Sequence, residues 1–164
     1  RLRWYISEAG KPISSAPIWE KKLKAGRLGT KETVKLNNIG DAILNLPFSE
    51  IITLIKEELP DSHSSSLDYL VPTLNVSYVR NYYEDFRGLR VTIDEYINFK
   101  SHLSMHEPLN KNRQFAYGNK VVELKFDPSC KNEVSELIRP LMLTPVRHSK
   151  YLTGLAMSGQ ALYL

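Results

Sequence analysis

The sequence predicts an α+β fold in which charged β-strands form a closed or nearly closed sheet with helices packed outside it. The first observation is a set of short runs that alternate charged and apolar residues with period two, as at residues 121–126. The second is a pair of segments, roughly residues 49–59 and 127–143, whose apolar residues follow helical spacing. If the charged faces of the strands converge, they form a cationic cavity, and the helices cover the outer, apolar face.

The alternating runs place charged residues on one face and apolar residues on the other. At the start of the chain, Arg1, Arg3 and Tyr5 share a face opposite Leu2 and Trp4. The other charged faces are Glu20 with Lys22, Lys31 with Thr33 and Lys35, Arg80 at the end of the run 74–80, Arg90 with Thr92 and Asp94, and Glu123 with Lys125. Turns within residues 7–17, 26–29 and 81–88 join neighbouring runs into hairpins.

Three segments of the sequence predict helices. Ser49 can cap the first helix, and Pro60 ends it. The dipeptide Asp127-Pro128 favours the start of the second helix. Ser149 can cap a last helix that runs through residue 156. The expected buried stripe of the second helix is Val134, Leu137, Ile138 and Leu141.

The remaining segments predict irregular structure. Residues 61–66 form a polar, serine-rich connection in which we expect His63 to face solvent. Residues 96–119 are polar and show no clear periodicity. Within them, His102 and His106 stand four apart, a spacing that on a helix could bind zinc. Zinc is the less favoured interpretation, because no third ligand and no accompanying glutamate complete the motif.

Composition sets limits on the function. The 164 residues fit one domain, and residues 1–164 show no repeat and no domain boundary. The net charge of +4 and the pI near 9.1 permit an anionic partner without requiring one. Cys130 is the only cysteine, which excludes an intrachain disulfide and favours a reducing, cytoplasmic compartment. The sequence has no apolar run long enough to span a bilayer and no signal-peptide pattern.

Several motifs occur in a fixed order along the chain. They are Arg1-Leu2-Arg3-Trp4-Tyr5, Glu20 with Lys22, Lys31, Tyr78 with Arg80, Leu89-Arg90-Val91-Thr92-Ile93-Asp94, Glu123-Leu124-Lys125 and Arg147-His148-Ser149-Lys150-Tyr151. This series resembles the catalytic domain of the vacuolar transporter chaperone (VTC) family, whose domains are polyphosphate polymerases of the CYTH, or triphosphate tunnel metalloenzyme, superfamily. The resemblance covers nearly the whole chain, although no single motif is specific by itself.

The resemblance implies an antiparallel β-barrel with a triphosphate tunnel, in which the terminal phosphoryl group of ATP is transferred to a polyphosphate chain. The implied partners are ATP and polyphosphate or triphosphate, and not nucleic acid, with Mn²⁺ or Mg²⁺ as cofactor. The positions that match as phosphate ligands are Arg1, Arg3, Lys22, Lys31, Arg80, Arg90, Lys125, Arg147 and Lys150. Among them, Arg80, Arg90, Lys125 and Lys150 are expected to act in catalysis, and Glu123 is expected to hold the metal.

These implied roles agree with the chemistry of the side chains. Phosphoryl transfer depends mainly on positioning and charge neutralisation, and arginine binds phosphate oxygens bidentately. A carboxylate such as Glu123 among so many cations suits a hard divalent metal.

The chain also departs from the family pattern. Members of the family begin with a strand that carries a further basic, glutamate-containing motif, then a helix and another strand, before the Arg-x-Arg strand. This sequence begins at the Arg-x-Arg strand. We therefore expect an N-terminally truncated tunnel domain that belongs to a longer protein, or a reduced relative with an incomplete tunnel.

Three other functional interpretations stay open. The same superfamily includes hydrolases that cleave triphosphate or nucleotides, and fold alone does not decide between synthesis and hydrolysis. A non-catalytic module that binds polyphosphate would need the same basic residues. The charges could also belong to solvated sheet faces without a ligand.

Overall fold

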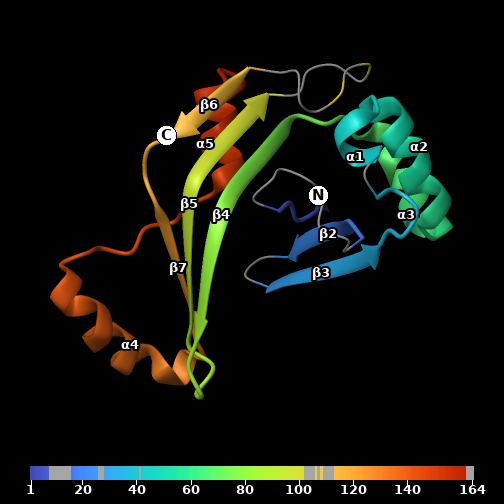
Figure 1. The fold of residues 1–164 in the computed structure, drawn as a ribbon. Coiled ribbons are helices and arrows are strands. Elements are labelled where there is room, and N and C mark those ends of the chain that lie inside the picture. The colour runs from blue at the N-terminus through green and yellow to red at the C-terminus, as the bar shows by residue number, and fades with distance from the viewer. Residues whose placement is uncertain are drawn as a thin grey trace. The chain divides into compact units, whose positions relative to one another are not determined.

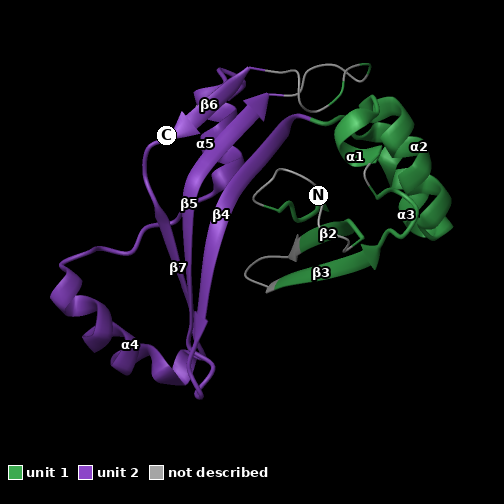
Figure 2. Ribbon diagram, viewed as in Figure 1, with its two compact units in different colours: residues 1–72, 102–112 green, residues 73–101, 113–164 purple. Residues whose placement is uncertain are grey.

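The computed structural model describes residues 1–7, 16–25, 28–40, 42–101, 106, 108 and 113–161. Helices and antiparallel strands occur together, which confirms the predicted α+β class. The described strands form two sheets, and the closed barrel stays a prediction. Two compact units make up the chain (Figure 2): unit 1 is residues 1–72 with 102–112, and unit 2 is residues 73–101 with 113–164.

Unit 1 contains an antiparallel sheet with strands in the order β1 (Leu2–Arg3), β2 (Ile18–Ala25) and β3 (Leu28–Lys35) (Figure 1). β2 and β3 form the predicted hairpin. Residues directly opposite each other on paired strands share a face of the sheet. Leu2 and Val34 both pair with Trp19, so these three residues lie on one apolar face.

Four helical segments complete the described part of unit 1: α1 (Ala42–Asn45), α2 (Phe48–Glu58), α3 (Asp61–Ser64) and η1 (Ser65–Tyr69). Their apolar residues form a core with Trp19 and the segment after β3. The buried members are Trp19, Leu36, Ile39, Ile43, Ile51, Ile55, Leu59 and Leu67, with Leu2 and Val34 packed against them. The predicted packing of the first helix against an apolar sheet face is therefore confirmed.

The sheet of unit 2 consists of β4 (Leu74–Glu84), β5 (Arg90–Ser101), β6 (Gln114–Tyr117) and β7 (Val121–Lys125) (Figure 1). β5 lies at its centre and pairs antiparallel with the other three strands. Opposite Tyr78, β5 carries the two residues Tyr96 and Ile97, which form a bulge. Tyr96 has φ 52°, a left-handed conformation that occurs at bulge positions.

Unit 2 also contains the helical segments η2 (Pro128–Cys130), α4 (Lys131–Ile138), η3 (Arg139–Leu141) and α5 (Lys150–Met157). α5 packs against β4 and β5 (Figure 1). The close approach is made at Gly154, where a Cβ atom would lie 2.5 Å from Leu74 and 2.6 Å from Phe99. Ser149 caps α5 as predicted, because its hydroxyl accepts a hydrogen bond from Leu152 N.

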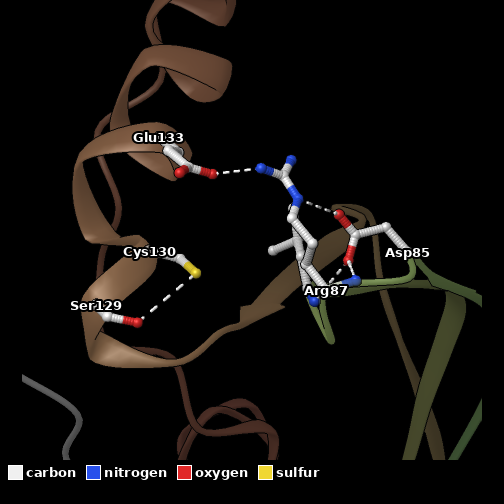
Figure 3. A network of polar contacts seen from close by, with 6 residues as sticks. Asp85, Arg87, Ser129, Cys130 and Glu133 are labelled. Atoms are coloured by element: carbon white, nitrogen blue, oxygen red, sulfur yellow. Dashed lines mark hydrogen bonds and ion pairs between the residues drawn. The ribbon is translucent and has the colours of Figure 1, made fainter.

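A polar network connects α4 to the turn between β4 and β5 (Figure 3). Asp85 Oδ1 accepts hydrogen bonds from the backbone amides of Arg87 and Leu89, at 2.9 Å each, and so fixes the turn. Arg87 Nη1 donates to Glu133 on α4 at 2.5 Å. Next to Glu133, Ser129 Oγ lies 3.9 Å from the thiol of Cys130. All of these groups belong to unit 2, so the network orients α4 within that unit.

Several details of the helices differ from prediction. Ser49 does not cap α2, because the helix begins at Phe48 and Pro47 occupies the cap position without a side-chain bond. Of the expected stripe on the second helix only Val134 is buried, whereas Leu137 and Leu141 are exposed. His63 does not face solvent, because its ring packs 5.0 Å from the Trp19 ring and its side chain is 20% exposed.

Residues 96–119 are more regular than expected, because β5 continues to Ser101 and β6 follows at Gln114–Tyr117. β5 carries the alternating pattern past a bulge, and a bulge shifts the pattern by one residue. The predicted loop at residues 7–17 lies mostly outside the described residues, as does His102. Within the described residues, no helix is long and apolar enough to cross a membrane.

Candidate functional site

The charged face of the unit 1 sheet lies opposite the apolar face that carries Trp19. On this face Lys22 pairs directly with Lys31 across the β2–β3 hairpin, and Glu20 pairs with Thr33. Arg1 and Arg3 flank Leu2, and both contact Glu20. The alternation predicted from the sequence is therefore confirmed for all three strands of unit 1.

Glu20 lies at the centre of this face, with a side chain that is 0% exposed. Its Oε2 accepts hydrogen bonds from Arg1, from Nε at 2.9 Å and from Nη2. Its Oε1 lies 3.5 Å from Arg3 Nη1 and 3.9 Å from Lys31 Nζ and has no hydrogen-bond partner among the described residues. We call Arg1, Arg3, Glu20 and Lys31 the Glu20 cluster.

The Glu20 cluster is positively charged. Burial raises the pKa of Glu20, but the hydrogen bond from Arg1 and the charges of Arg1, Arg3 and Lys31 outweigh burial and hold that pKa below its usual value. The carboxylate is therefore ionised at neutral pH. One negative charge then faces three positive charges, which leaves the cluster with an excess of cations.

In unit 2, three rows of cross-strand partners define a second charged face on β4, β5 and β7. The rows are Arg80 with Asp94 and Val121, Tyr82 with Thr92 and Glu123, and Glu84 with Arg90 and Lys125. Because cross-strand partners share a face, the side chains of all three rows lie on one side of the sheet. Arg90 shares a face with Asp94, and Glu123 shares a face with Lys125, as predicted. The register of β5 and β7 places these two faces on the same side of the sheet.

Asp94 forms the buried centre of this second face, also with a side chain that is 0% exposed. Arg80 donates to both carboxylate oxygens, from Nε at 2.6 Å and from Nη2 at 2.8 Å. Lys150 Nζ lies 2.6 Å from Oδ2. The Tyr78 ring lies under both cations, 5.2 Å from the Arg80 guanidinium and 5.3 Å from Lys150 Nζ. We call Tyr78, Arg80, Asp94 and Lys150 the Asp94 cluster.

The Asp94 cluster is held by charge-assisted hydrogen bonds. Burial raises the pKa of Asp94, but the hydrogen bonds from Arg80 and Lys150 outweigh burial and leave the pKa below its usual value. The hydrogen bond to Asp94 in turn raises the pKa of Arg80. Asp94 and Arg80 are therefore charged at neutral pH, and with the formal charge of Lys150 the cluster has one more positive than negative charge.

The opposite end of the unit 2 face is more exposed and carries alternating charges. Arg90 Nε donates to Glu84 at 3.2 Å, and Tyr82 donates to the same carboxylate at 2.5 Å. Lys125 Nζ lies 3.4 Å from Glu123 Oε1. Arg90 and Lys125 also lie directly opposite each other across β5 and β7. Exposed ion pairs of this kind contribute little stability by themselves, about 0–1 kcal/mol.

A metal could bind at Glu123 only together with another source of ligands. The described residues contain no group of three or more His, Cys, Asp or Glu side chains that could hold a metal ion. Mg²⁺ is usually bound by one or two carboxylates together with phosphate oxygens and water. Glu123 is part-exposed and pairs across the strands with Thr92, whose hydroxyl is buried without a hydrogen-bond partner among the described residues. This arrangement fits a metal that arrives with phosphate.

The predicted phosphate ligands fall on both units. Arg1, Arg3 and Lys31 meet in the Glu20 cluster, and Lys22 lies on the same face. Arg80 and Lys150 meet in the Asp94 cluster, whereas Arg90 and Lys125 lie further along that face. Arg147 is exposed in the irregular segment before α5. His106 lies in a turn, and its expected zinc partner His102 is outside the described residues.

Sequence reasoning did not assign a role to the two buried carboxylates, Glu20 and Asp94. Both alternate in step with the basic residues of their strands, so the sequence could have indicated that they share the charged faces. Their burial was not visible in the sequence, because it depends on the arginine and lysine side chains that neighbouring elements bring to them.

Comparison with known proteins gives one match. Residues 1–158 match the family model of the VTC domain. Neither curated proteins nor solved structures gave a match to the chain. The matched range includes both charged faces and both buried carboxylates, which lie at the positions that carried the resemblance in the sequence. The chain therefore belongs to the VTC domain family.

Proposed function

We propose that the chain binds polyphosphate along its two charged faces and transfers the terminal phosphoryl group of ATP to the end of that polyphosphate. The observation that carries this proposal is a pair of cations directly opposite each other on each sheet, Lys22 with Lys31 and Arg90 with Lys125. Like charges directly opposite on paired strands are destabilising. Arg90, Lys125 and Lys31 each also lie near one carboxylate, and a bound polyanion would add to this neutralisation.

Membership in the VTC domain family supports polyphosphate as the polyanion. Its repeating phosphates could contact several of the cations that β2, β3, β5 and β7 carry on these faces. The proposed ligands are Arg1, Arg3, Lys22, Lys31, Arg80, Arg90, Lys125, Arg147 and Lys150. The proposed architecture around the polymer is an antiparallel tunnel.

In the proposed reaction, an oxygen of the terminal phosphate of the polymer attacks the γ-phosphorus of ATP. The bond from the γ-phosphorus to the bridging oxygen breaks, ADP leaves, and the polymer grows by one phosphate. This transfer needs positioning and charge neutralisation more than covalent participation by the protein. Arg80, Arg90, Lys125 and Lys150 neutralise the charge on the reacting phosphates in this proposal, because a guanidinium or ammonium group binds phosphate oxygens strongly.

Glu123 is the proposed ligand of a divalent cation, Mn²⁺ or Mg²⁺, that enters bound to phosphate. Such a cation would neutralise charge on the phosphate oxygens. The part-exposed position of Glu123 on the charged face supports this role. A cation held there would free Lys125, whose Nζ lies 3.4 Å from Glu123 Oε1, to contact phosphate.

Incubation of the chain with γ-labelled ATP, Mn²⁺ and short polyphosphate tests the proposed function. We expect label in a polymer that lengthens with time. Label released as inorganic phosphate would instead indicate a hydrolase of the same superfamily. Tight, salt-sensitive binding of tripolyphosphate without turnover would indicate a non-catalytic binding module. Absence of binding at low ionic strength would contradict all three functions and leave the charged faces as solvated surfaces.

A further inference from the structure

The hydrogen bonds of Arg80 show how a residue can be fixed and still bind a ligand. A guanidinium group has five N–H donors in a rigid plane. Arg80 uses Nε and Nη2 to bind Asp94, and Nη1 takes no part in these two bonds. The side chain is 38% exposed, so the edge away from Asp94 can reach a phosphate. Arg80 can therefore contact Asp94 and a ligand at the same time.

Lys150 shows the same combination from a different element. It is the first residue of α5, and Ser149 caps that helix. One of its three donors is directed to Asp94 Oδ2 at 2.6 Å, and its side chain is 19% exposed. Arg80 and Lys150 carry like formal charges and meet at the same carboxylate, so they would repel each other if Asp94 did not lie between them.

We propose that Asp94 is a positioning residue, which holds Arg80 and Lys150 in the geometry that binds phosphate before the polyanion arrives. This inference rests on the proposed polyphosphate site. It assigns to a negatively charged residue a favourable effect on polyanion binding, opposite in sign to what its charge alone would give. Both carboxylate oxygens of Asp94 are used, and its side chain is 0% exposed, so it does not itself offer a surface for the ligand.

Glu20 makes the contrast clear. Only its Oε2 is hydrogen-bonded, and Arg3 and Lys31 lie 3.5 Å and 3.9 Å from Oε1. Arg3 Nε is also buried without a partner among the described residues. Glu20 therefore fixes Arg1 and leaves Arg3 and Lys31 loosely held, whereas Asp94 fixes both of its cations. Positioning by Glu20 is accordingly expected to act on Arg1 alone.

Calorimetric titration of tripolyphosphate into the metal-free chain tests the proposal, with Asp94→Asn compared against Glu133→Gln. Each variant removes one carboxylate charge from unit 2, and Glu133 contacts Arg87, which is not a proposed phosphate ligand. At 0.5 M salt, where long-range attraction is screened on the scale of about 3–10 Å, we expect Asp94→Asn to bind roughly tenfold more weakly than wild type, because each oriented charge-assisted contact is strong. Glu133→Gln should bind as tightly as wild type. If Asp94→Asn binds as tightly as Glu133→Gln, the positioning role is overturned.

A double variant separates action through Lys150 from general damage. If Asp94 acts by holding Lys150, Lys150→Ala should lower affinity less in the Asp94→Asn background than in wild type. Equal losses in both backgrounds would contradict the proposal. Wild-type chain that fails to bind tripolyphosphate at any salt would instead refute the proposed function, and this outcome is distinct from a failure of the Asp94 inference.

A measurement on the wild-type chain covers the case in which Asp94→Asn does not fold. The ammonium group of Lys150 should exchange its protons with water slowly in the absence of ligand, because Asp94 holds it, and NMR of ¹⁵N-labelled lysine reports this exchange. Lys125, which is 63% exposed, is the internal reference. The ammonium signal that is missing from the spectrum of Lys150→Ala is the signal of Lys150. Exchange at Lys150 as fast as at Lys125 would overturn the proposal.

Discussion

Replacement of Gly154 by alanine tests whether α5 is held against the sheet by a glycine contact. The added Cβ atom would lie 2.5 Å from Leu74 Cδ2, 2.6 Å from Phe99 Cδ1 and 3.0 Å from Phe99 Cγ. The leucine methyl can rotate away, but Phe99 is fully buried and the contacts involve the body of its ring. The helix must therefore move outward, and with it Lys150 at its first turn.

The expected loss follows from two opposing effects. Overpacking of a close-packed core costs about 1–3 kcal/mol. Alanine is favoured over glycine within a helix by about 1 kcal/mol, which offsets part of that cost. We expect Gly154→Ala to lower the free energy of unfolding of unit 2 by up to about 2 kcal/mol. Displacement of Lys150 from Asp94 should also weaken tripolyphosphate binding.

The assay must report on unit 2, and this choice follows from the chain. Both tryptophans, Trp4 and Trp19, belong to unit 1, so tryptophan fluorescence reports on the other unit. Hydrogen exchange of peptides from α5 and β5 measures the intended region. Gly118→Ala is the matched control, because its added Cβ meets no atom within 4 Å. Exchange in Gly154→Ala that is as slow as in wild type would refute the packing argument.

Four further predictions concern the charged faces. Tripolyphosphate at millimolar concentration should raise the melting temperature of the chain, because a ligand of the native state stabilises it by mass action. The shift should shrink as salt is added, and an equal shift in 1 M salt would contradict an electrostatic site. Arg90→Ala should weaken tripolyphosphate binding by about 1.5–3 kcal/mol through loss of a charge-assisted contact. Glu123→Gln should instead keep metal-free binding and lose metal-dependent turnover, so full turnover with Mn²⁺ in that variant would show that the metal ligand is another residue. Stability should fall as pH drops below about 4, the unfolded value for such carboxyl groups. The sign follows because folding lowers the pKa values of Glu20 and Asp94. Their contribution to stability is therefore fully present above the unfolded pKa and is lost as pH falls through the folded pKa. Urea unfolding between pH 2 and pH 6 measures this contribution. If the unfolding free energy of Asp94→Asn falls with pH as steeply as that of wild type, Asp94 does not contribute to the pH dependence.

Local patterns correctly predicted most strands and the composition of each strand face. Arg90, Thr92 and Asp94 alternate with apolar residues, and the register places them on one side of the sheet. Alternation follows from the backbone of an extended chain, so it can be read without knowing which strands pair. The predicted cap at Ser149 is correct for a similar reason, because the bond joins residues three apart.

The errors arose where a distant contact decides the outcome. His63 lies in a polar segment but packs against Trp19 on β2. Leu137 fits a helical stripe on α4 but is exposed, whereas Val134 of the same stripe is buried. The strand β5 extends past the predicted end because a bulge at Tyr96 shifts the alternation. None of these contacts leaves a trace in the local sequence.

The sequence by itself determined which residues share a charged face and which family the chain resembles, because both depend on the order of residues along short segments. Only the tertiary structure decided that Glu20 and Asp94 are buried at the centres of those faces. Arg1 lies nineteen residues from Glu20, Arg80 lies fourteen from Asp94, and Lys150 comes from a separate helix. A buried carboxylate is stable only when its hydrogen-bond partners are in place. Its burial is therefore a property of the assembled strands and helix and not of any one of them.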